Sequence, residues 1–120
     1  VNPRVVLAGD FNIAPEDRDV HDPLAWAGQI LCSAPERAAF QRLLALGLKD
    51  SFRLFEQPAK SFSWWDYRML GFQKNQGLRI DHILLSEVLA ERCTAAGISR
   101  ELRKLERPSD HAPVTAEIAD

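Results

Sequence analysis

Cysteine is scarce in this chain of 120 residues, which holds two, Cys32 and Cys93, with no Cys-x-x-Cys spacing. Because the two cysteines lack this spacing, they do not form a redox or zinc motif, and both are expected to be ordinary free thiols. A hydrophobic run long enough to cross a bilayer is also missing, and residues 1–4 show no signal-peptide pattern. These absences predict a protein of the reducing cytoplasm that makes no contact with a membrane.

Positive charge is not in excess, because 15 Lys and Arg residues face 17 Asp and Glu residues, for a formal net charge of −2. This balance argues against non-specific wrapping of nucleic acid by bulk charge. It does not exclude a nucleic-acid substrate, since divalent cations at a carboxylate-rich site would offset the local negative charge. Internal repeats, low-complexity tracts and linkers are absent as well. The length then predicts a single unit over residues 1–120.

The hydrophobic pattern predicts an α/β fold. Residues 4–9 form a nearly continuous apolar run, which is typical of a strand buried on both faces. Residues 78–85 alternate and then become continuously apolar, which is typical of a central strand. Further strands are expected at 93–98 and 113–118, and residues 61–67 are aromatic and strand-like.

One helix has clear start and stop signals in the sequence and is expected at residues 35–46. Ser33 offers a cap, Glu36 stands three residues after it, and Gly47 supplies the stop. Ser86 is expected to cap a short helix that runs to about residue 91. The remaining segments are expected to be a connector at 50–55, a loop at 13–31 with at most a short helical turn, and a loop at 68–77.

Aspartates recur at strand ends and in tight turns, namely Asp10, Asp81 and Asp110. Asn12 accompanies the first and His111 the last. Carboxylate oxygens are the ligands that Mg²⁺ prefers, and two residues that are two positions apart on an extended segment point the same way. Each residue alone has an ordinary structural explanation as a turn former or cap. Their joint occurrence favours a site for a divalent cation and a phosphate group.

Four motifs make the pattern specific: GDFN at residues 9–12, SWWDYR at 63–68, GLRID at 77–81 and PSDHAPV at 108–114. In this order and spacing they resemble the carboxy-terminal half of exonuclease III-type enzymes, from residue 5 to residue 118. The first and last motifs occur across the wider endonuclease/exonuclease/phosphatase group, whereas the middle two point to the exonuclease III branch. The resemblance implies one β-sheet layer with flanking helices, half of the family's four-layered α/β sandwich.

The resemblance also implies a role for each polar residue of a Mg²⁺- or Mn²⁺-dependent phosphodiesterase. Asp10 would position or deprotonate the attacking water, or handle the leaving group, and Asn12 would orient Asp10 and contact the scissile phosphate. His111 would bond a non-bridging oxygen and stabilise charge in the transition state, with Asp81 orienting it. Asp110 would help to hold the cation, within a metal site that also includes Asp10, Asn12 and His111.

Trp64, Leu78 and Ile80 match positions that line a small apolar pocket for a flipped-out abasic sugar in this family. Without the resemblance they would be taken for ordinary core. Arg68 and Arg79 flank the site as candidate phosphate contacts. The implied substrate is double-stranded DNA with abasic sites or 3′ ends, and the implied activities are 3′-to-5′ exodeoxyribonuclease and abasic-site endonuclease in DNA repair.

The family's amino-terminal half, with a metal-binding Glu, an Asn and a Tyr, has no counterpart here, and the first residue is Val1. We therefore expect a fragment that is inactive, or nearly so, and binds Mg²⁺ weakly. A sheet face left uncovered by the missing half would favour a homodimer. Two alternatives stay open: a phosphatase of the same superfamily acting on a small molecule or lipid, and a non-catalytic fragment or assembly module.

Overall fold

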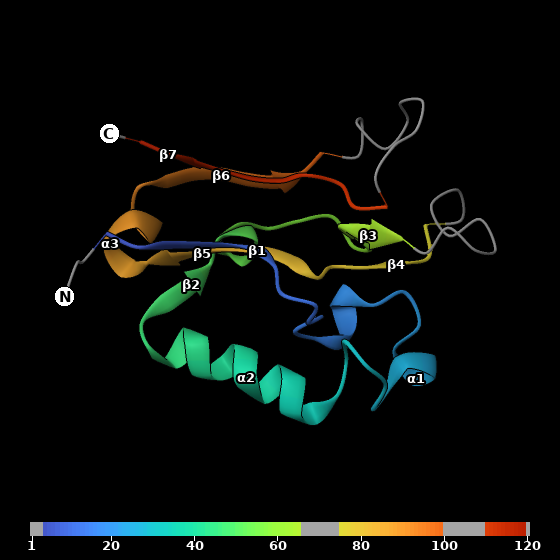
Figure 1. The fold of residues 1–120 in the computed structure, drawn as a ribbon. Coiled ribbons are helices and arrows are strands. Elements are labelled where there is room, and N and C mark those ends of the chain that lie inside the picture. The colour runs from blue at the N-terminus through green and yellow to red at the C-terminus, as the bar shows by residue number, and fades with distance from the viewer. Residues whose placement is uncertain (1–3, 66–74, 100–109, 120) are drawn as a thin grey trace.

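The computed structural model describes residues 4–65, 75–99 and 110–119 of the chain. Its strands lie in two layers above a long helix (Figure 1). The central layer is a three-stranded antiparallel sheet in the order β1-β5-β2, with β1 at Val6–Asp10, β5 at Asp81–Ser86 and β2 at Leu48–Asp50. The class predicted from the sequence, α/β, is confirmed.

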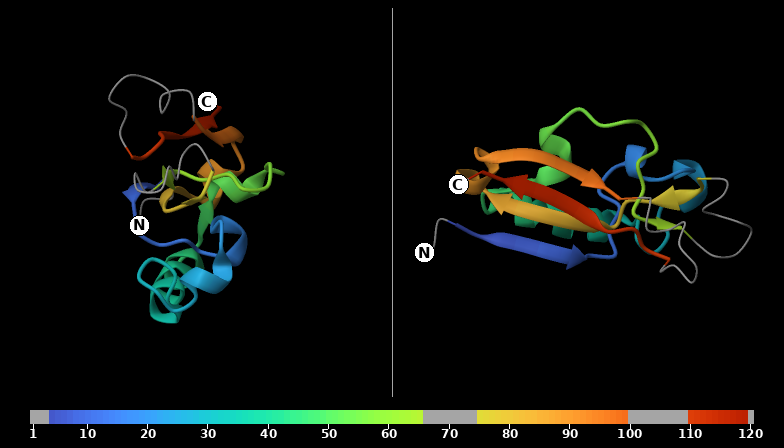
Figure 2. Two further views of the ribbon diagram at one scale, coloured as in Figure 1. Left: turned by 90° about the vertical axis from the view of Figure 1, so that its right-hand side faces the viewer. Right: turned by 90° about the horizontal axis from the view of Figure 1, so that it is seen from above.

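An antiparallel ribbon of β6 (Cys93–Ile98) and β7 (Val114–Ile118) lies over one face of the central sheet, and α2 (Ala34–Ala45) lies under the other (Figures 1 and 2). A third ladder, β3 (Trp64–Trp65) with β4 (Gly77–Leu78), extends beyond one end of β5. The predicted strands at 93–98 and 113–118 are therefore confirmed, and the strands of the predicted layer are divided among three sheets.

The α2 helix begins where its cap chemistry predicts. The hydroxyl of Ser33 accepts the N–H of Glu36, and the Glu36 carboxylate accepts the N–H of Ser33 in return. Phe40, which is 1% exposed, packs its ring against Phe11 and His82 and so fixes the helix under the sheet. The helix predicted at residues 35–46 is confirmed.

The first strand differs from its prediction in burial. Residues 4–9 were expected to be buried on both faces, but Val6 is 51% exposed and every residue of β1 is exposed. The prediction is wrong for the described chain because β1 is an edge strand that pairs only with β5 there. An apolar run shows what a strand is suited to contact, not which neighbours it has.

Several connections are more ordered than expected. The 50–55 connector divides into the end of β2 and a 3₁₀ turn at Ser51–Leu54, and the 13–31 loop carries two short helices, Asp17–Asp19 and α1 at Pro23–Trp26. The expected strand at 78–85 breaks between β4 and β5, although β5 is central as predicted.

Two more expectations need correction at the ends of these elements. Ser86 precedes α3 (Glu87–Ala90), but its hydroxyl accepts the Val5 N–H instead of capping the helix. Gly77 was expected in a loop and lies in β4, where an added Cβ would stand 2.5 Å from the Trp64 carbonyl oxygen. Only glycine allows that approach. Of the 68–77 loop, residues 68–74 lie outside the described chain, as do residues 66–67 of the aromatic segment.

No helix in the described residues is both long enough and apolar enough to span a membrane.

Candidate active site

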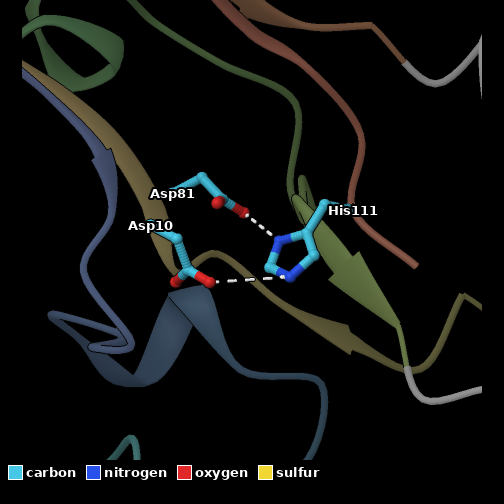
Figure 3. Close-up of side chains that lie close together, drawn as sticks. All are labelled: Asp10, Asp81 and His111. Carbon is cyan, nitrogen blue, oxygen red and sulfur yellow. Dashed lines mark hydrogen bonds and ion pairs between the residues drawn. The ribbon is translucent and has the colours of Figure 1, made fainter. Parts of the chain in front are cut away.

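Asp10, Asp81 and His111 meet at one end of the central sheet (Figure 3). Asp10 ends β1 and Asp81 begins β5, and the two are direct partners across the antiparallel pair. His111 reaches them from the segment before β7, where it forms a bridge with Trp64 of β3. One ligand atom from each of the three residues lies within 4.8 Å of the others. The sequence prediction that these residues share a site is consistent with this geometry.

The shortest contact in the group joins His111 to Asp81. The His111 Nδ1 lies 2.8 Å from the Asp81 Oδ2, and an ionised carboxylate can only accept, so the Nδ1–H donates. The Nε2 then faces Asp10 Oδ2 at 3.6 Å and Asp110 Oδ1 at 3.8 Å, both longer than a hydrogen bond. The imidazole is therefore oriented by one carboxylate and presented to two others.

A buried serine holds Asp81 in place. The Ser63 hydroxyl accepts the backbone N–H of Ile80 at 3.0 Å and that of Asp81 at 3.1 Å, and Ser63 is fully buried. Burial raises the pKa of the Asp81 carboxyl above its usual value, while hydrogen bonds with His111 and Ser63 act to lower it. The sequence patterns assign Ser63 no role, and its one signal is its place at the start of the SWWDYR motif.

Asp10 and Asn12 are related by a turn instead of by a strand. The Asn12 N–H donates to Asp10 Oδ1 at 3.0 Å, and Asn12 has a φ of 55°, in the left-handed region that Asn tolerates better than most residues. The premise of an extended segment is wrong, because β1 ends at Asp10. Through this bond Asn12 fixes one oxygen of Asp10, while the other oxygen faces His111.

Asp110 is held by an aromatic side chain. The Trp64 indole N–H donates to Asp110 Oδ2 at 3.1 Å, and the Trp65 N–H donates to the Asp110 carbonyl at 3.2 Å. Trp64 had been assigned only to the wall of a sugar pocket. Its indole nitrogen links that wall to the carboxylate cluster.

The expected pocket residues lie together but mostly in the interior. Leu78 is 0% exposed and Ile80 2%, in one cluster with Ala14, Val20 and Cys32, and the half-buried Trp64 packs against it. Their role in receiving a sugar stays a prediction. Arg68 lies outside the described residues.

Arg79 is not a surface phosphate contact, and that expectation is wrong. It is 1% exposed and bonds Asp19 Oδ1 and Asp50 Oδ2, each at 2.7 Å. Burial would raise the pKa of the Asp19 carboxyl, but Arg79 and Arg53 together hold it below its usual value. The sequence could not reveal this cluster, because its members are far apart along the chain. Its effect is to fasten the loop after β1 to β2 and β4.

The oxygen-rich donor set fits a hard divalent cation. The ligand atoms of Asp10, Asp81 and His111 lie within 4.8 Å of one another, and the Asp110 carboxylate lies 3.8 Å from His111 Nε2. The carboxylates of Asp10 and Asp110 both lie beside His111, and each accepts a hydrogen bond from a neighbouring N–H donor.

The fold and this site place the chain in a known family. The model of the endonuclease/exonuclease/phosphatase family matches residues 1–111, and the chain belongs to that family. Its sequence is 49% identical to exodeoxyribonuclease III of Haemophilus influenzae, over 94% of this chain and 45% of that protein. The resemblance stated from the motifs is thereby confirmed.

Two solved structures extend the comparison. A 3′ phosphatase, NExo, from Neisseria, bound to a product DNA hairpin, is 50% identical with a TM-score of 0.95, over 98% of this chain and 46% of that one. An AP endonuclease from Archaeoglobus fulgidus is 34% identical with a TM-score of 0.91, over 98% of this chain and 47% of that one. The chain therefore spans less than half the length of these relatives.

Proposed function

We propose that the protein containing this chain is a DNA-repair phosphodiesterase that acts as a 3′-to-5′ exodeoxyribonuclease and abasic-site endonuclease. One observation carries the proposal: His111 is oriented by Asp81 at 2.8 Å and faces the carboxylates of Asp10 and Asp110. A metal-dependent phosphodiesterase uses these parts, namely a proton donor, a proton acceptor and ligands for a cation. The 49% identity to exodeoxyribonuclease III supports DNA as the substrate.

Each side chain then has a place in the reaction. His111 in its protonated form donates Nε2–H to a non-bridging phosphoryl oxygen, and Asp81 keeps the ring in that orientation. Asp10 positions or deprotonates the attacking water with the oxygen that faces His111. Asn12 fixes the other Asp10 oxygen through its backbone, and its amide side chain contacts the scissile phosphate.

The cation would be Mg²⁺ or Mn²⁺, and Asp10, Asn12, Asp110 and His111 would hold it. When bound, it supplies charge neutralisation at the phosphate. Asp110 is suited to this because the Trp64 N–H fixes one oxygen, so the carboxylate is not left to rotate.

Double-stranded DNA with an abasic site or a 3′ end is the proposed substrate. Trp64, Leu78 and Ile80 form an apolar cluster beside the carboxylates, which suits a sugar that has lost its base. Arg68 belongs to the motif that carries Trp64, and we propose that it contacts a phosphate.

A DNA 3′-phosphatase is the second candidate. It is supported by the 50% identity to the Neisseria 3′ phosphatase NExo, and a second structure, 52% identical, describes NExo as a 3′-5′ exonuclease, so one relative carries both descriptions. The same catalytic groups could serve the nuclease and the 3′-phosphatase reactions. Each of these reactions hydrolyses a phosphate ester at a 3′ oxygen or beside an abasic sugar.

The test uses the full-length protein with Mg²⁺ and three duplexes that carry an abasic site, a recessed 3′ end or a 3′-phosphate. Turnover of at least one, reduced at least 100-fold by Asp10→Asn and hardly changed by Asp17→Asn at an exposed position, is expected. Release of phosphate from inositol phosphates or phospholipids in place of DNA cleavage would favour the rival phosphatase. No turnover of any ester would favour a non-catalytic module.

We further propose that the isolated chain is inactive, because it spans less than half the length of its relatives. It would form a homodimer by packing two uncovered sheet faces together, and Val6 and Leu7 of β1, with Val5 just before the strand, are exposed apolar residues. Sedimentation of a folded monomer at high concentration would contradict this. The cytoplasm is the proposed location, since both cysteines are free thiols.

A further inference from the structure

His82 is a buried polar side chain that the proposed reaction does not use. It follows Asp81 on β5, is 1% exposed, and packs edge-on against the rings of Phe11 and Phe40, whose centroids lie 5.5 and 4.8 Å from its own. A polar ring in such a place needs a partner for each nitrogen. The sequence pattern alone gives no reason to assign it a role.

Both ring nitrogens have partners, and these partners determine the tautomer. The guanidinium Nη1 of Arg79 lies 3.2 Å from His82 Nδ1 and can only donate, so Nδ1 accepts. The Nε2 lies 2.7 Å from the carbonyl oxygen of Ile13, which can only accept, so Nε2–H donates. The neutral ring is therefore an oriented link from a buried arginine to the backbone at Ile13.

Arg79 makes a rigid starting point for this link. Its guanidinium is fixed by two carboxylates, Asp19 and Asp50, at 2.7 Å each, and it is 1% exposed. The Nη1 of the same guanidinium donates a hydrogen bond to His82 Nδ1. Because the guanidinium is planar and held on several sides, the imidazole has little freedom to rotate.

The other end of the link is the turn that carries Asp10 and Asn12. The Phe11 N–H donates to the Ile80 carbonyl at 3.0 Å before the turn, and the Asn12 N–H donates to Asp10 within it. Asn12 is left-handed, with a φ of 55°, a conformation that persists only when its surroundings hold it. The bond from His82 to Ile13 secures the exit of this turn.

We infer that His82 is a positioning residue: it holds the Ile13 carbonyl, and through it the turn after β1, so that Asp10 stays aimed at His111. The effect of His82 on catalysis rests on the proposed function, because it assumes that Asp10 acts in the reaction. The tautomer of His82 and the geometry of the turn do not depend on that function.

Two substitutions in the full-length protein separate the halves of the link. His82→Gln places an amide N–H near the Nε2 position and can still donate to Ile13. His82→Asn places its amide near the Nδ1 position, can meet Arg79, and falls short of Ile13. We expect His82→Asn to lower kcat tenfold or more with little change in KM, and His82→Gln to restore most of it.

Phe40→Leu is the matched control, because it loosens the packing of His82 and Phe11 but leaves every hydrogen bond in place. If stability alone mattered, Phe40→Leu would lower kcat as much as His82→Asn at an equal loss of stability, and the inference would fail. Equal kcat for the Gln and Asn variants would also overturn it.

Two measurements without turnover complete the test. Nitrogen NMR of the labelled ring should show Nδ1 unprotonated and Nε2 protonated, and amide exchange at Asn12 should quicken tenfold or more in His82→Asn but not in Phe40→Leu. The opposite tautomer or unchanged exchange refutes the positioning role. Activity that survives Asp10→Asn would instead refute the proposed reaction while leaving these two results intact.

Discussion

The indole nitrogen of Trp64 donates a hydrogen bond of 3.1 Å to the carboxylate of Asp110. The same Trp64 ring packs against the buried cluster that contains Leu78 and Ile80. One side chain therefore contacts both the proposed cation ligand and the proposed sugar pocket. A substrate that displaces this ring would also shift the carboxylate.

Trp64→Phe keeps an aromatic ring and removes the donor to Asp110. We expect the affinity of the full-length protein for Mn²⁺ to fall about tenfold, since an unsupported ligand must be ordered when the ion binds. Titration calorimetry or manganese spin resonance measures this directly.

The matched control is Trp65→Phe, the same change one residue later. The Trp65 indole donates to Asn75 instead, at 3.1 Å. It should lower stability without lowering ion affinity. Equal affinity losses in the two variants would show that the Asp110 bond has no special part.

Ser63→Ala tests the support of Asp81. It leaves the buried N–H groups of Ile80 and Asp81 without their acceptor, so the free energy of unfolding should fall by about 1–3 kcal/mol. Loss of the Ser63 bond should also raise the pKa of Asp81 further, as carboxyl NMR would show. Ser61→Ala, at an exposed hydroxyl bonded to the Pro58 carbonyl, should change neither quantity.

Arg79→Met tests the buried ion cluster. Asp50 would be left without its charged partner and Asp19 with Arg53 alone, so unfolding should become easier by roughly 3–5 kcal/mol. Arg18→Met removes an ion pair with Glu16 in which both side chains are at least half exposed, and should cost less than about 1 kcal/mol. Chemical denaturation of both variants gives the comparison, and similar losses would contradict it.

His82 should make the protein less stable in mild acid. Burial, with the charge of Arg79, lowers its pKa from 6.5 to about 4. Between these values the unfolded chain binds a proton that the folded chain does not, so stability falls as pH falls, by up to about 1.4 kcal/mol per pH unit. Above 6.5 the group contributes no pH dependence.

Denaturant unfolding of the parent protein and of His82→Gln from pH 7 to pH 4 isolates this group, because the other histidines contribute equally to both. The slope should be shallower in the variant. Parallel curves would mean that His82 is not kept neutral by the fold.

Local chemistry made α2 predictable, since Ser33 and Glu36 cap each other within one turn. The three-residue strand β2 was not predictable, because it exists only through its pairing with β5, distant in the chain. The burial of the first strand was misjudged for the same reason.

The site shows the same division. The motifs pointed to Asp10, Asp81 and His111, and the structure brings them together. Ser63 and His82 escaped notice because a buried serine or histidine looks the same in a sequence as an exposed one. Their partners are backbone groups far along the chain, which no residue pattern encodes.

The convergence of Asp10, Asp81 and His111 has a consequence for folding. These residues come from near the start, the middle and the end of the chain, so their cluster can form only after its most distant contacts have closed. A cation bound there would stabilise only the completed fold, by mass action. Partly folded molecules would therefore bind the ion weakly, and the ion-bound molecules would be those in which all three residues have come together.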